Sequence, residues 1–277
     1  MAHCRVKEAE KILDKPFKVL DKGFIRLVDY LGSDERIVQA ARVSYGKGTD
    51  SVSKDEALID YLMRQQHTSP FEQVVLTFHL KMPIFVARQW VRHRMGRMNE
   101  LSGRFSVMQE EFYVPAKEDI DPQKKDRLER ALEPVEPAEA AKIQSDLKKG
   151  QKKAYESYKD LIEKGLAREI ARINLPLSLY TEFYWQMDLN NLFRFLKLRL
   201  DPHAQLEMRK YAEIILEIVR KVCPVATASF ENIMLKQVAF NGEEIDALRK
   251  VLAGEANPLT GQKLDRFLTK VKTGHQM

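Results

Sequence analysis

The stretch RHRMGRMNELSGR, from Arg92 to Arg104, gathers four arginines, a histidine, a serine and two glycines. Arginine side chains stay protonated at physiological pH, so they do not act as general bases. They bind phosphates through a planar, bidentate fork and stabilise developing negative charge. A run of charges is also typical of a solvated surface. Physical chemistry alone therefore leaves two interpretations open, a solvated face or a site that holds a phosphorylated anion.

Other kinds of chemistry have weaker support in the residue pattern. Ser102 lies in Leu-Ser-Gly, outside the G-x-S-x-G turn of a serine nucleophile, and no paired base is evident. Cys223 ends an apolar helical segment, where a cysteine is usually a small buried hydrophobe. The histidines lack zinc-site spacing, and no G-x-G-x-x-G follows a strand. We therefore predict no metal site and no dinucleotide-binding fingerprint.

Composition indicates a globular protein with an apolar core. The chain has 277 residues, 44% of them apolar, which suffices for one or two domains. Its net charge of +6 favours anionic ligands without requiring nucleic acid. No apolar run approaches the ~20 residues that cross a bilayer, and no signal-peptide core is evident. Cys4 and Cys223 make no disulfide framework, so we expect a soluble, cytoplasmic protein without a membrane partner.

The elements that must position the arginines follow from the spacing of apolar residues. Residues 23–32 are expected to form a strand, and residues 34–46 and 54–66 to form amphipathic helices. The strictly alternating residues 74–82 predict a half-buried strand. Residues 104–115 are expected to form another strand after the arginine-rich stretch.

Two helix starts are predicted near the candidate residues. Ser69 is followed by a proline and, three residues on, by a glutamate, which together form a capping-box pattern. A short helix with an anion-friendly N-terminus is therefore expected to begin there. Pro83 opens another helix, on which Gln89, Arg92 and His93 share a face because they are three and four residues apart.

The second half of the chain is predicted to be mainly helical. Residues 116–150 are charged and contain three prolines, which indicates a solvent-exposed helical excursion. Residues 181–189 alternate like a strand, and Asp188 is placed to cap the helix that follows. Residues 201–224 are expected to form a long amphipathic helix. The chain is thus α+β, with one domain over residues 1–235 and an extension of two small helices over residues 236–277.

Several ordered blocks of the sequence resemble the flavin-dependent thymidylate synthase family. Arg92-His93-Arg94, then seven residues, then Ser102 match the R-H-R-x7-S signature of that family. The blocks ARVSY, HTSPFE, IFVARQW, NELSGR, LPLSLYTEFYW and FLKLRLDPHAQ also look like family segments, in the right order. The similarity spans residues 23–225 and favours a ligand site over a solvated face.

The resemblance implies a fold, an activity and a set of ligands. It implies a single catalytic domain with an antiparallel-rich sheet and flanking helices. The implied reaction is reductive methylation of dUMP to dTMP for dTTP synthesis. Methylenetetrahydrofolate would provide the carbon and reduced FAD the hydride, with NADPH regenerating the flavin. It also implies a homotetramer whose sites are shared between subunits, with no nucleic-acid partner.

The resemblance further implies residue roles. Arg199 matches the residue that activates the uracil, and its fixed charge beside a pyrimidine carbonyl would stabilise the anion that makes C5 nucleophilic. Contacts to dUMP are implied for Gln89, Trp90, Val91, Arg92, Glu100, Leu101, Ser102, Gly103, Arg104, Arg172 and Arg199. Contacts to FAD are implied for Ser44, His67, Ser69, Arg92, His93, Arg94, Glu100, Asp188, Leu189, Asn190 and Arg194.

Two positions depart from the family pattern. Asp188 stands where Asn is frequent, and Arg194 stands where Asn or His is frequent. A carboxylate beside FAD phosphates is unfavourable, so Asp188 is also interpreted as a helix cap alone. Two alternative functions stay open at this point: a methyltransferase with Cys223 as nucleophile, and a basic nucleic-acid-binding protein. The roles of residues 116–150 and 236–277 are not indicated by the sequence.

Overall fold

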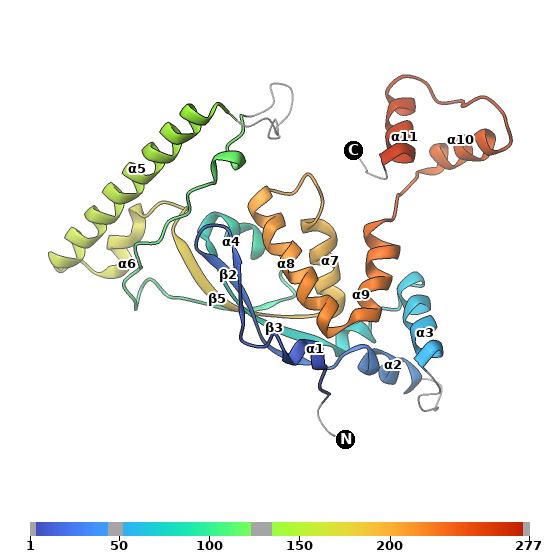
Figure 1. Cartoon of the computed structure of the whole chain (residues 1–277), viewed down its shortest axis with the longest axis horizontal. Coiled ribbons are helices and arrows are strands. Elements are labelled where there is room, and N and C mark those ends of the chain that lie inside the picture. The colour runs from blue at the N-terminus through green and yellow to red at the C-terminus, as the bar shows by residue number, and fades with distance from the viewer. Residues whose placement is uncertain (1–3, 44–51, 123–134, 274–277) are drawn as a thin grey trace.

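A five-stranded antiparallel sheet forms the centre of the computed structural model, which describes residues 4–43, 52–122 and 135–273 (Figure 1). The predicted α+β class is confirmed. The sheet order is β1-β2-β3-β5-β4, and the strand bounds are Pro16–Val19 for β1, Gly23–Leu31 for β2, Val75–Pro83 for β3, Arg97–Glu100 for β4 and Tyr180–Asp188 for β5.

The helices lie mostly around and beyond this sheet. Their bounds are Lys7–Glu10 for α1, Asp34–Arg42 for α2, Val52–Arg64 for α3, Ile84–Trp90 for α4, Pro137–Glu163 for α5, Arg168–Ala171 for α6, Leu189–Arg199 for α7, Leu206–Val222 for α8, Pro224–Phe230 for α9, Gly242–Leu252 for α10 and Gly261–Thr273 for α11. Short single turns are η2 at Phe71–Gln73, η3 at Lys117–Asp119, η4 at Arg172–Asn174 and η5 at Glu231–Leu235. In the described part of the chain, no helix has both the length and the apolar character to cross a membrane.

The alternation predicted for the central strands is confirmed. On β3, Leu76, Phe78 and Leu80 are buried, whereas the residues between them are only partly covered. β3 pairs with β5 in antiparallel register, with Phe78 opposite Trp185. Because side chains alternate between the two faces of a strand, this register gathers the apolar residues of both strands on one side.

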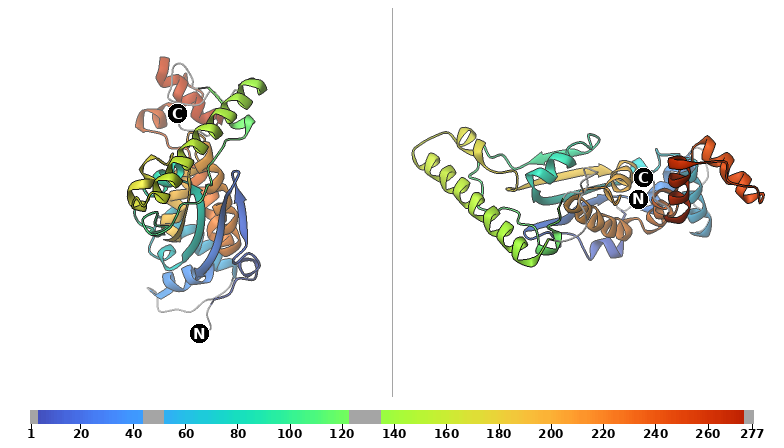
Figure 2. Two further views of the ribbon diagram at one scale, coloured as in Figure 1. Left: turned by 90° about the vertical axis from the view of Figure 1, so that its left-hand side faces the viewer. Right: turned by 90° about the horizontal axis from the view of Figure 1, so that it is seen from above.

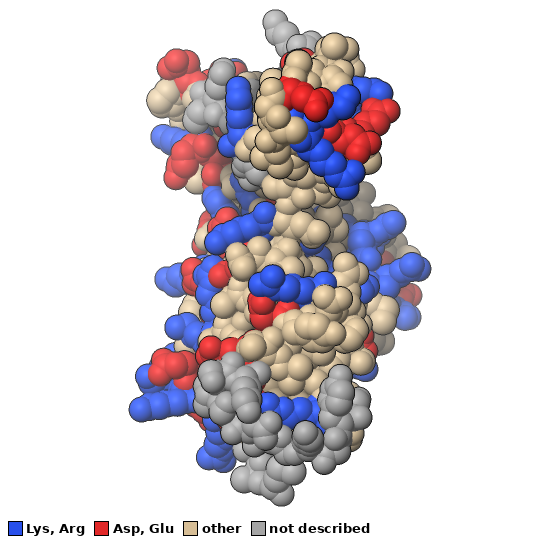
Figure 3. All heavy atoms as spheres, turned by 90° about the vertical axis from the view of Figure 1, so that its right-hand side faces the viewer, with Lys and Arg blue, Asp and Glu red and all other residues tan. Residues whose placement is uncertain are grey.

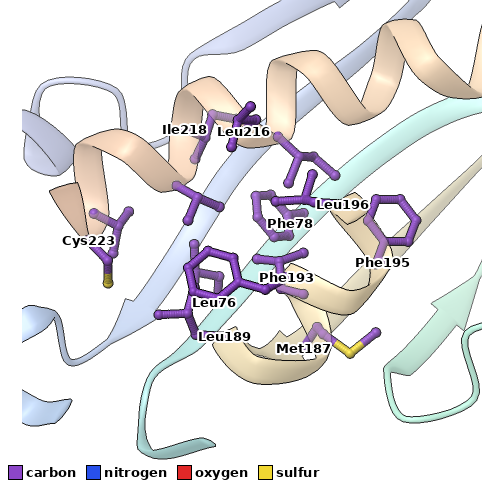
Figure 4. Packing of buried hydrophobic residues seen from close by; sticks show 14 of the residues in the cluster. Leu76, Phe78, Met187, Leu189, Phe193, Phe195, Leu196, Leu216, Ile218 and Cys223 are labelled. Carbon is purple, nitrogen blue, oxygen red and sulfur yellow. The ribbon is translucent and has the colours of Figure 1, made fainter. Parts of the chain in front are cut away.

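Helices α7 and α8 cover that apolar side of the sheet. Figure 4 shows Phe193, Phe195 and Leu196 of α7 packed with side chains of β3 and α8. The buried α8 residues Tyr211, Ile215 and others recur at helical spacing, so one stripe of the helix meets the core. The opposite side of the sheet is more open: Tyr184 is 45% exposed and stacks on His79 with ring centroids 4.8 Å apart.

The arginine-rich stretch folds differently from the prediction. Helix α4 ends at Trp90, so Arg92 and His93 lie in the turn after it and do not continue a helical face with Gln89. Strand β4 occupies Arg97–Glu100, between the helix and the strand that were predicted on either side of it. Residues 104–115, predicted as a strand, are irregular apart from one bridge residue, because the edge of β5 is already paired with β4.

The charged segment and the capping box also need correction. Helix α5 continues through Gly150 to Glu163 as one helix, because Gln151, Tyr155 and Tyr158 fix it against the body of the protein. At residues 69–72 the expected helix is only the turn η2, with Pro70 at its N-cap and no side-chain cap hydrogen bond. The glutamate of the proposed box instead accepts a hydrogen bond from Asn190 Nδ2 at 3.3 Å.

The C-terminal segment forms the two helices that were predicted, α10 and α11. Asn241 and Glu244 make a reciprocal capping box at the start of α10, and Ala247, Leu259 and Phe267 form a small apolar cluster. These helices lie at the opposite end of an elongated molecule from α5 (Figure 2). The proposed domain boundary at residues 235 and 236 stays a prediction.

Two glycines give a matched test of this packing. A Cβ on Gly23 would lie 2.7 Å from the Val19 carbonyl oxygen and 2.8 Å from the Lys81 carbonyl oxygen. Both are backbone atoms, so we expect Gly23→Ala to lower the free energy of unfolding by about 1–3 kcal/mol. Gly150 on α5 has no atom within 4 Å, so Gly150→Ala should raise it by about 0.5–1 kcal/mol. Denaturant midpoints measure both, and equal midpoints for the two variants would contradict the packing described.

Candidate active site

Arg199, His93 and Gln89 are joined by hydrogen bonds where two helices end. Arg199 is in the last turn of α7, Gln89 is in the last turn of α4, and His93 follows α4 in a turn. Arg199 Nε donates to His93 Nε2 at 2.9 Å, and an Nη of Arg199 donates to the Gln89 carbonyl oxygen at 3.1 Å. The His93 ring also lies edge-on to Phe195, with centroids 4.8 Å apart. The predicted catalytic arginine is therefore held in one orientation.

The electrostatics of this pair favour one charge state. Burial, and then the charge of Arg199, lower the pKa of His93 to about 4 from its usual 6.5. Burial also lowers the pKa of Arg199, but a guanidinium stays protonated near neutral pH. Because His93 Nε2 accepts the hydrogen bond, that nitrogen carries no proton. The arrangement is a fixed cation held against a neutral imidazole.

A second group surrounds the turn after β4. The backbone N–H of Leu101 donates to the Glu182 carbonyl oxygen at 2.9 Å, and Thr181 Oγ1 donates to Glu100 Oε1 at 2.6 Å. A Cβ on Gly103 would lie 3.2 Å from Arg172 atoms, so the absence of a side chain there lets Arg172 approach the turn.

Arg104 is held at the same turn by an ion pair. Its Nε lies 2.7 Å from Glu169 Oε2, and the two side chains are 57% and 46% exposed. The Ser102 carbonyl oxygen accepts the N–H groups of Phe105 and Ser106, which closes the turn. Ser102 and Arg104 thus come from one segment and Arg172 from another far along the sequence, and arginines at such a turn can hold an anion through charge-assisted hydrogen bonds.

A third group lines a pocket of about 210 Å³ between α3 and α7. His67, Asn190, Arg194 and Lys197 provide its polar wall. Its apolar wall includes Leu62, Met63, Phe71, Phe193, Ile233 and Met234. A pocket with an apolar floor and cationic groups suits an aromatic ring that carries negatively charged substituents.

Ser69 is next to this pocket in sequence but lines a different hollow. That hollow, of about 480 Å³, also contains Arg36 and Gln73. Ser44 lies outside the described residues. Arg92 and Arg94 are exposed in the turn after α4. Within the described ranges, no hydrogen bond or ion pair joins the three groups of candidate residues.

Three of the residues with predicted ligand contacts have structural roles. The Trp90 side chain is 0% exposed and packs on Trp185 and Phe195. Its predicted contact with dUMP stays a prediction, and with the side chain buried such a contact would have to come from the backbone. Leu189 is likewise 0% exposed, because its side chain belongs to the core. Asp188 Oδ1 accepts the Asn191 backbone N–H at 3.0 Å, and Oδ2 accepts the Asn191 side-chain amide at 2.8 Å. Both of its oxygens are used in capping α7, as one of the two interpretations predicted.

Three further residues extend the first group and were not predicted. Gln89 Nε2 donates to Gln205 Oε1, Gln205 Nε2 donates to Glu207 Oε2 at 2.9 Å, and Tyr113 Oη donates to Glu207 Oε1 at 3.1 Å. Glu207 could have been found from the sequence, because it falls four residues before Tyr211 on the apolar stripe of α8. A carboxylate on such a stripe must be hydrogen-bonded.

The alternative catalytic groups are poorly placed. Cys223 is 0% exposed and lies among apolar side chains (Figure 4). Burial raises the pKa of its thiol well above the usual value, which opposes thiolate formation. No cluster of three or more metal-ligating side chains occurs in the described ranges. On the face shown in Figure 3, basic and acidic side chains are interspersed, and the residues described there make no continuous basic track for nucleic acid.

Comparison with known proteins gives consistent matches. The family described as thymidylate synthase complementing protein matches residues 26–225, and the thymidylate synthase ThyX C-terminal domain matches residues 238–277. The chain is 56% identical to the flavin-dependent thymidylate synthase of Treponema denticola, over 96% of this chain and 100% of that protein. Its identity to the Treponema pallidum enzyme of the same description is 54%, over 100% of this chain and 91% of that protein.

A solved structure agrees with the sequence matches. It is described as the UMP/dUMP methylase PolB from Streptomyces cacaoi bound with 5-Br dUMP. The two structures align with a TM-score of 0.73 at 31% identity, over 79% of this chain and 99% of that chain. This chain therefore belongs to the flavin-dependent thymidylate synthase family, and the resemblance of its ordered motifs is confirmed.

The Arg199–His93 pair leads to a prediction about pH. Because the pKa of His93 is depressed on folding, the unfolded chain takes up this proton first as the pH falls. The contribution of neutral His93 to stability is complete above pH 6.5 and is lost as the pH falls from 6.5 towards about 4. Arg199→Gln should raise the pKa of His93 part of the way to 6.5, since burial, the larger cause, is unchanged.

Side-chain NMR titration of His93 measures this effect. Arg88 lies on α4 with an exposed side chain, so Arg88→Gln is the matched control and should leave the pKa near 4. An unchanged His93 pKa in Arg199→Gln would show that the two side chains do not interact.

Proposed function

We propose that this chain converts dUMP to dTMP in the cytoplasm, with methylenetetrahydrofolate as carbon donor, reduced FAD as hydride donor and NADPH as the reductant of the flavin. Family membership supports the activity, and the name of the family supports the flavin. The observation that carries the chemical proposal is the fixed guanidinium of Arg199, held by neutral His93 and the Gln89 carbonyl.

Arg199 is proposed to act on the pyrimidine ring directly. A donor aimed at a uracil carbonyl stabilises the negative charge that develops there as C5 becomes nucleophilic. Charge stabilisation is greatest where the donor is preorganised, and the two hydrogen bonds of Arg199 fix it before a substrate arrives. Neutral His93 allows this because a protonated imidazole could not accept from the Arg199 Nε–H.

The turn after β4 is proposed to hold the dUMP phosphate. Arg104 and Arg172 provide permanent positive charge, and Ser102 and nearby backbone amides provide neutral donors. The exposed Arg104–Glu169 pair contributes little to stability. Replacing it with a contact between Arg104 and a phosphate therefore costs little free energy. Glu100 and Leu101 position the turn through their contacts with β5.

The residues present fit FAD. Arg92 and Arg94 are exposed cations suited to phosphates, and the pocket at His67, Asn190 and Arg194 joins an apolar floor to positive charge. When bound, FAD supplies the hydride that completes the methyl group. His93, Ser69 and Ser44 are the remaining proposed contacts, whereas the buried side chain of Leu189 and the capped Asp188 leave only backbone contact at that segment.

A homotetramer with shared sites is proposed on two grounds. Among the residues that the structure describes, no hydrogen bond or ion pair joins the three groups of candidate residues, and a neighbouring chain could complete a site that one group begins. Apolar side chains close to the phosphate turn are also exposed, with Phe105 at 72% and Ile173 at 71%. Apolar surface of this kind is typical of protein interfaces.

The purified protein with its flavin provides the test. We expect a yellow protein that oxidises NADPH faster when dUMP is present and forms dTMP when methylenetetrahydrofolate is added. Arg199→Ala should keep its FAD but lose on the order of 10²–10³ in turnover, because one preorganised charge contact is removed.

Arg249→Ala is the matched control for this substitution. Arg249 is exposed on α10, with a side chain that is 75% exposed, and should keep full turnover. A colourless protein that does not take up FAD would contradict the proposed function. Near-normal turnover by Arg199→Ala would contradict only the proposed role of Arg199, not the proposed function.

A further inference from the structure

The chain of hydrogen bonds behind Gln89 has a fixed direction. Glu207 is 8% exposed, and its two carboxylate oxygens accept from Tyr113 and from Gln205. A carboxylate only accepts, so Gln205 must turn its NH₂ group towards Glu207. The Gln205 carbonyl oxygen then faces Gln89, which must donate to it.

This direction determines what Gln89 offers to a ligand. Its Nε2 is engaged with Gln205, whereas its Oε1 accepts no hydrogen bond from any residue in the described ranges. Reversal of the Gln89 amide would set two carbonyl oxygens against each other unless Gln205 also reversed. Reversal of Gln205 would in turn place its oxygen against the buried Glu207 carboxylate, which is costly.

Gln89 and Arg199 present neighbouring groups of opposite kind. The guanidinium of Arg199 donates to the backbone carbonyl oxygen of Gln89, so the two residues are in direct contact. The proposed function places the nucleotide base at this contact. Uracil has an N3–H donor between two carbonyl oxygens, whereas cytosine has an acceptor at N3 and an amino group at C4. A donor beside an acceptor on the protein therefore pairs with a carbonyl oxygen and the N3–H of uracil. At cytosine, the lone pair of N3 would face the lone pair of the protein acceptor, and the two would repel each other.

We propose that Glu207, acting through Gln205, is a positioning residue that makes the site selective for uracil over cytosine nucleotides. It does so by holding the Gln89 Oε1 acceptor towards the N3–H of the base. This inference rests on the proposed function, because it needs the nucleotide base to lie at Arg199 and Gln89. Selectivity follows from a buried acceptor at the far end of the chain, three side chains from the base.

Glu207→Gln tests the direction of the chain with almost no change in shape. A glutamine at this position can donate as well as accept, so the amides of Gln205 and Gln89 are free to reverse together. For the full-length flavoprotein, we expect the Kd of dUMP to rise on the order of tenfold, the effect of about one hydrogen bond. The ratio of the dCMP Kd to the dUMP Kd should fall by a similar factor. Titration calorimetry with each nucleotide measures both.

Three further variants distinguish an effect of hydrogen-bond direction from a loss of structural support by Glu207. Tyr113→Phe removes a donor to Glu207 but keeps the carboxylate, so it should keep the selectivity ratio. Gln205→Met breaks the chain at a half-buried position without altering Glu207, and should lower the ratio as Glu207→Gln does. Glu213→Gln, at an exposed position of α8, is the matched control and should bind both nucleotides as the parent does.

The outcomes are distinguishable. If the parent binds dUMP but Glu207→Gln and Gln205→Met keep its selectivity ratio, the inference is wrong while the proposed function stands. Equal losses for dUMP, dCMP and FAD with a lowered Tm would assign Glu207 a structural role only and also overturn the inference. A parent flavoprotein that binds no dUMP would overturn the proposed function, and the inference with it.

Discussion

The hydrogen bond from Arg199 to His93 is the interaction on which the site depends. It couples a permanent charge to an imidazole that must stay neutral in order to accept, and burial keeps it neutral by lowering the pKa of His93. The cation thus needs no carboxylate partner, which would cancel part of its field. A guanidinium held by neutral acceptors keeps its charge available for a developing anion.

The sheet explains why these residues meet. β3 leads into α4 at one end of the sheet, and β5 leads into α7 at the other, because the two strands are antiparallel. Helix α7 then runs back, and Phe195 packs on Trp90 with ring centroids 4.6 Å apart. Trp90 thus fixes the end of α4 against α7, and so places the Gln89 carbonyl within reach of Arg199.

The central strands and the Asp188 cap could be predicted, because alternation and capping are local patterns that burial reinforced. The capping box at Ser69 failed because a local motif gave way to a tertiary contact, the hydrogen bond from Asn190 to Glu72. The motif places Trp90 among the predicted dUMP contacts, whereas its packing on Trp185 and Phe195 depends on tertiary structure that the motif does not show. Tyr113 and Glu207 are hydrogen-bonded but lie more than 90 residues apart in the sequence. The spacing of residues along the chain could not predict this contact.

The central claim is that the pyrimidine is activated by a fixed charge and not by a covalent bond to the protein. Its most direct test is mass spectrometry of the intact flavoprotein, quenched rapidly during turnover with dUMP, methylenetetrahydrofolate and NADPH. The account predicts the mass of the unmodified chain at every time point. A nucleotide attached in stoichiometric amount to Ser102 or Cys223 would contradict it.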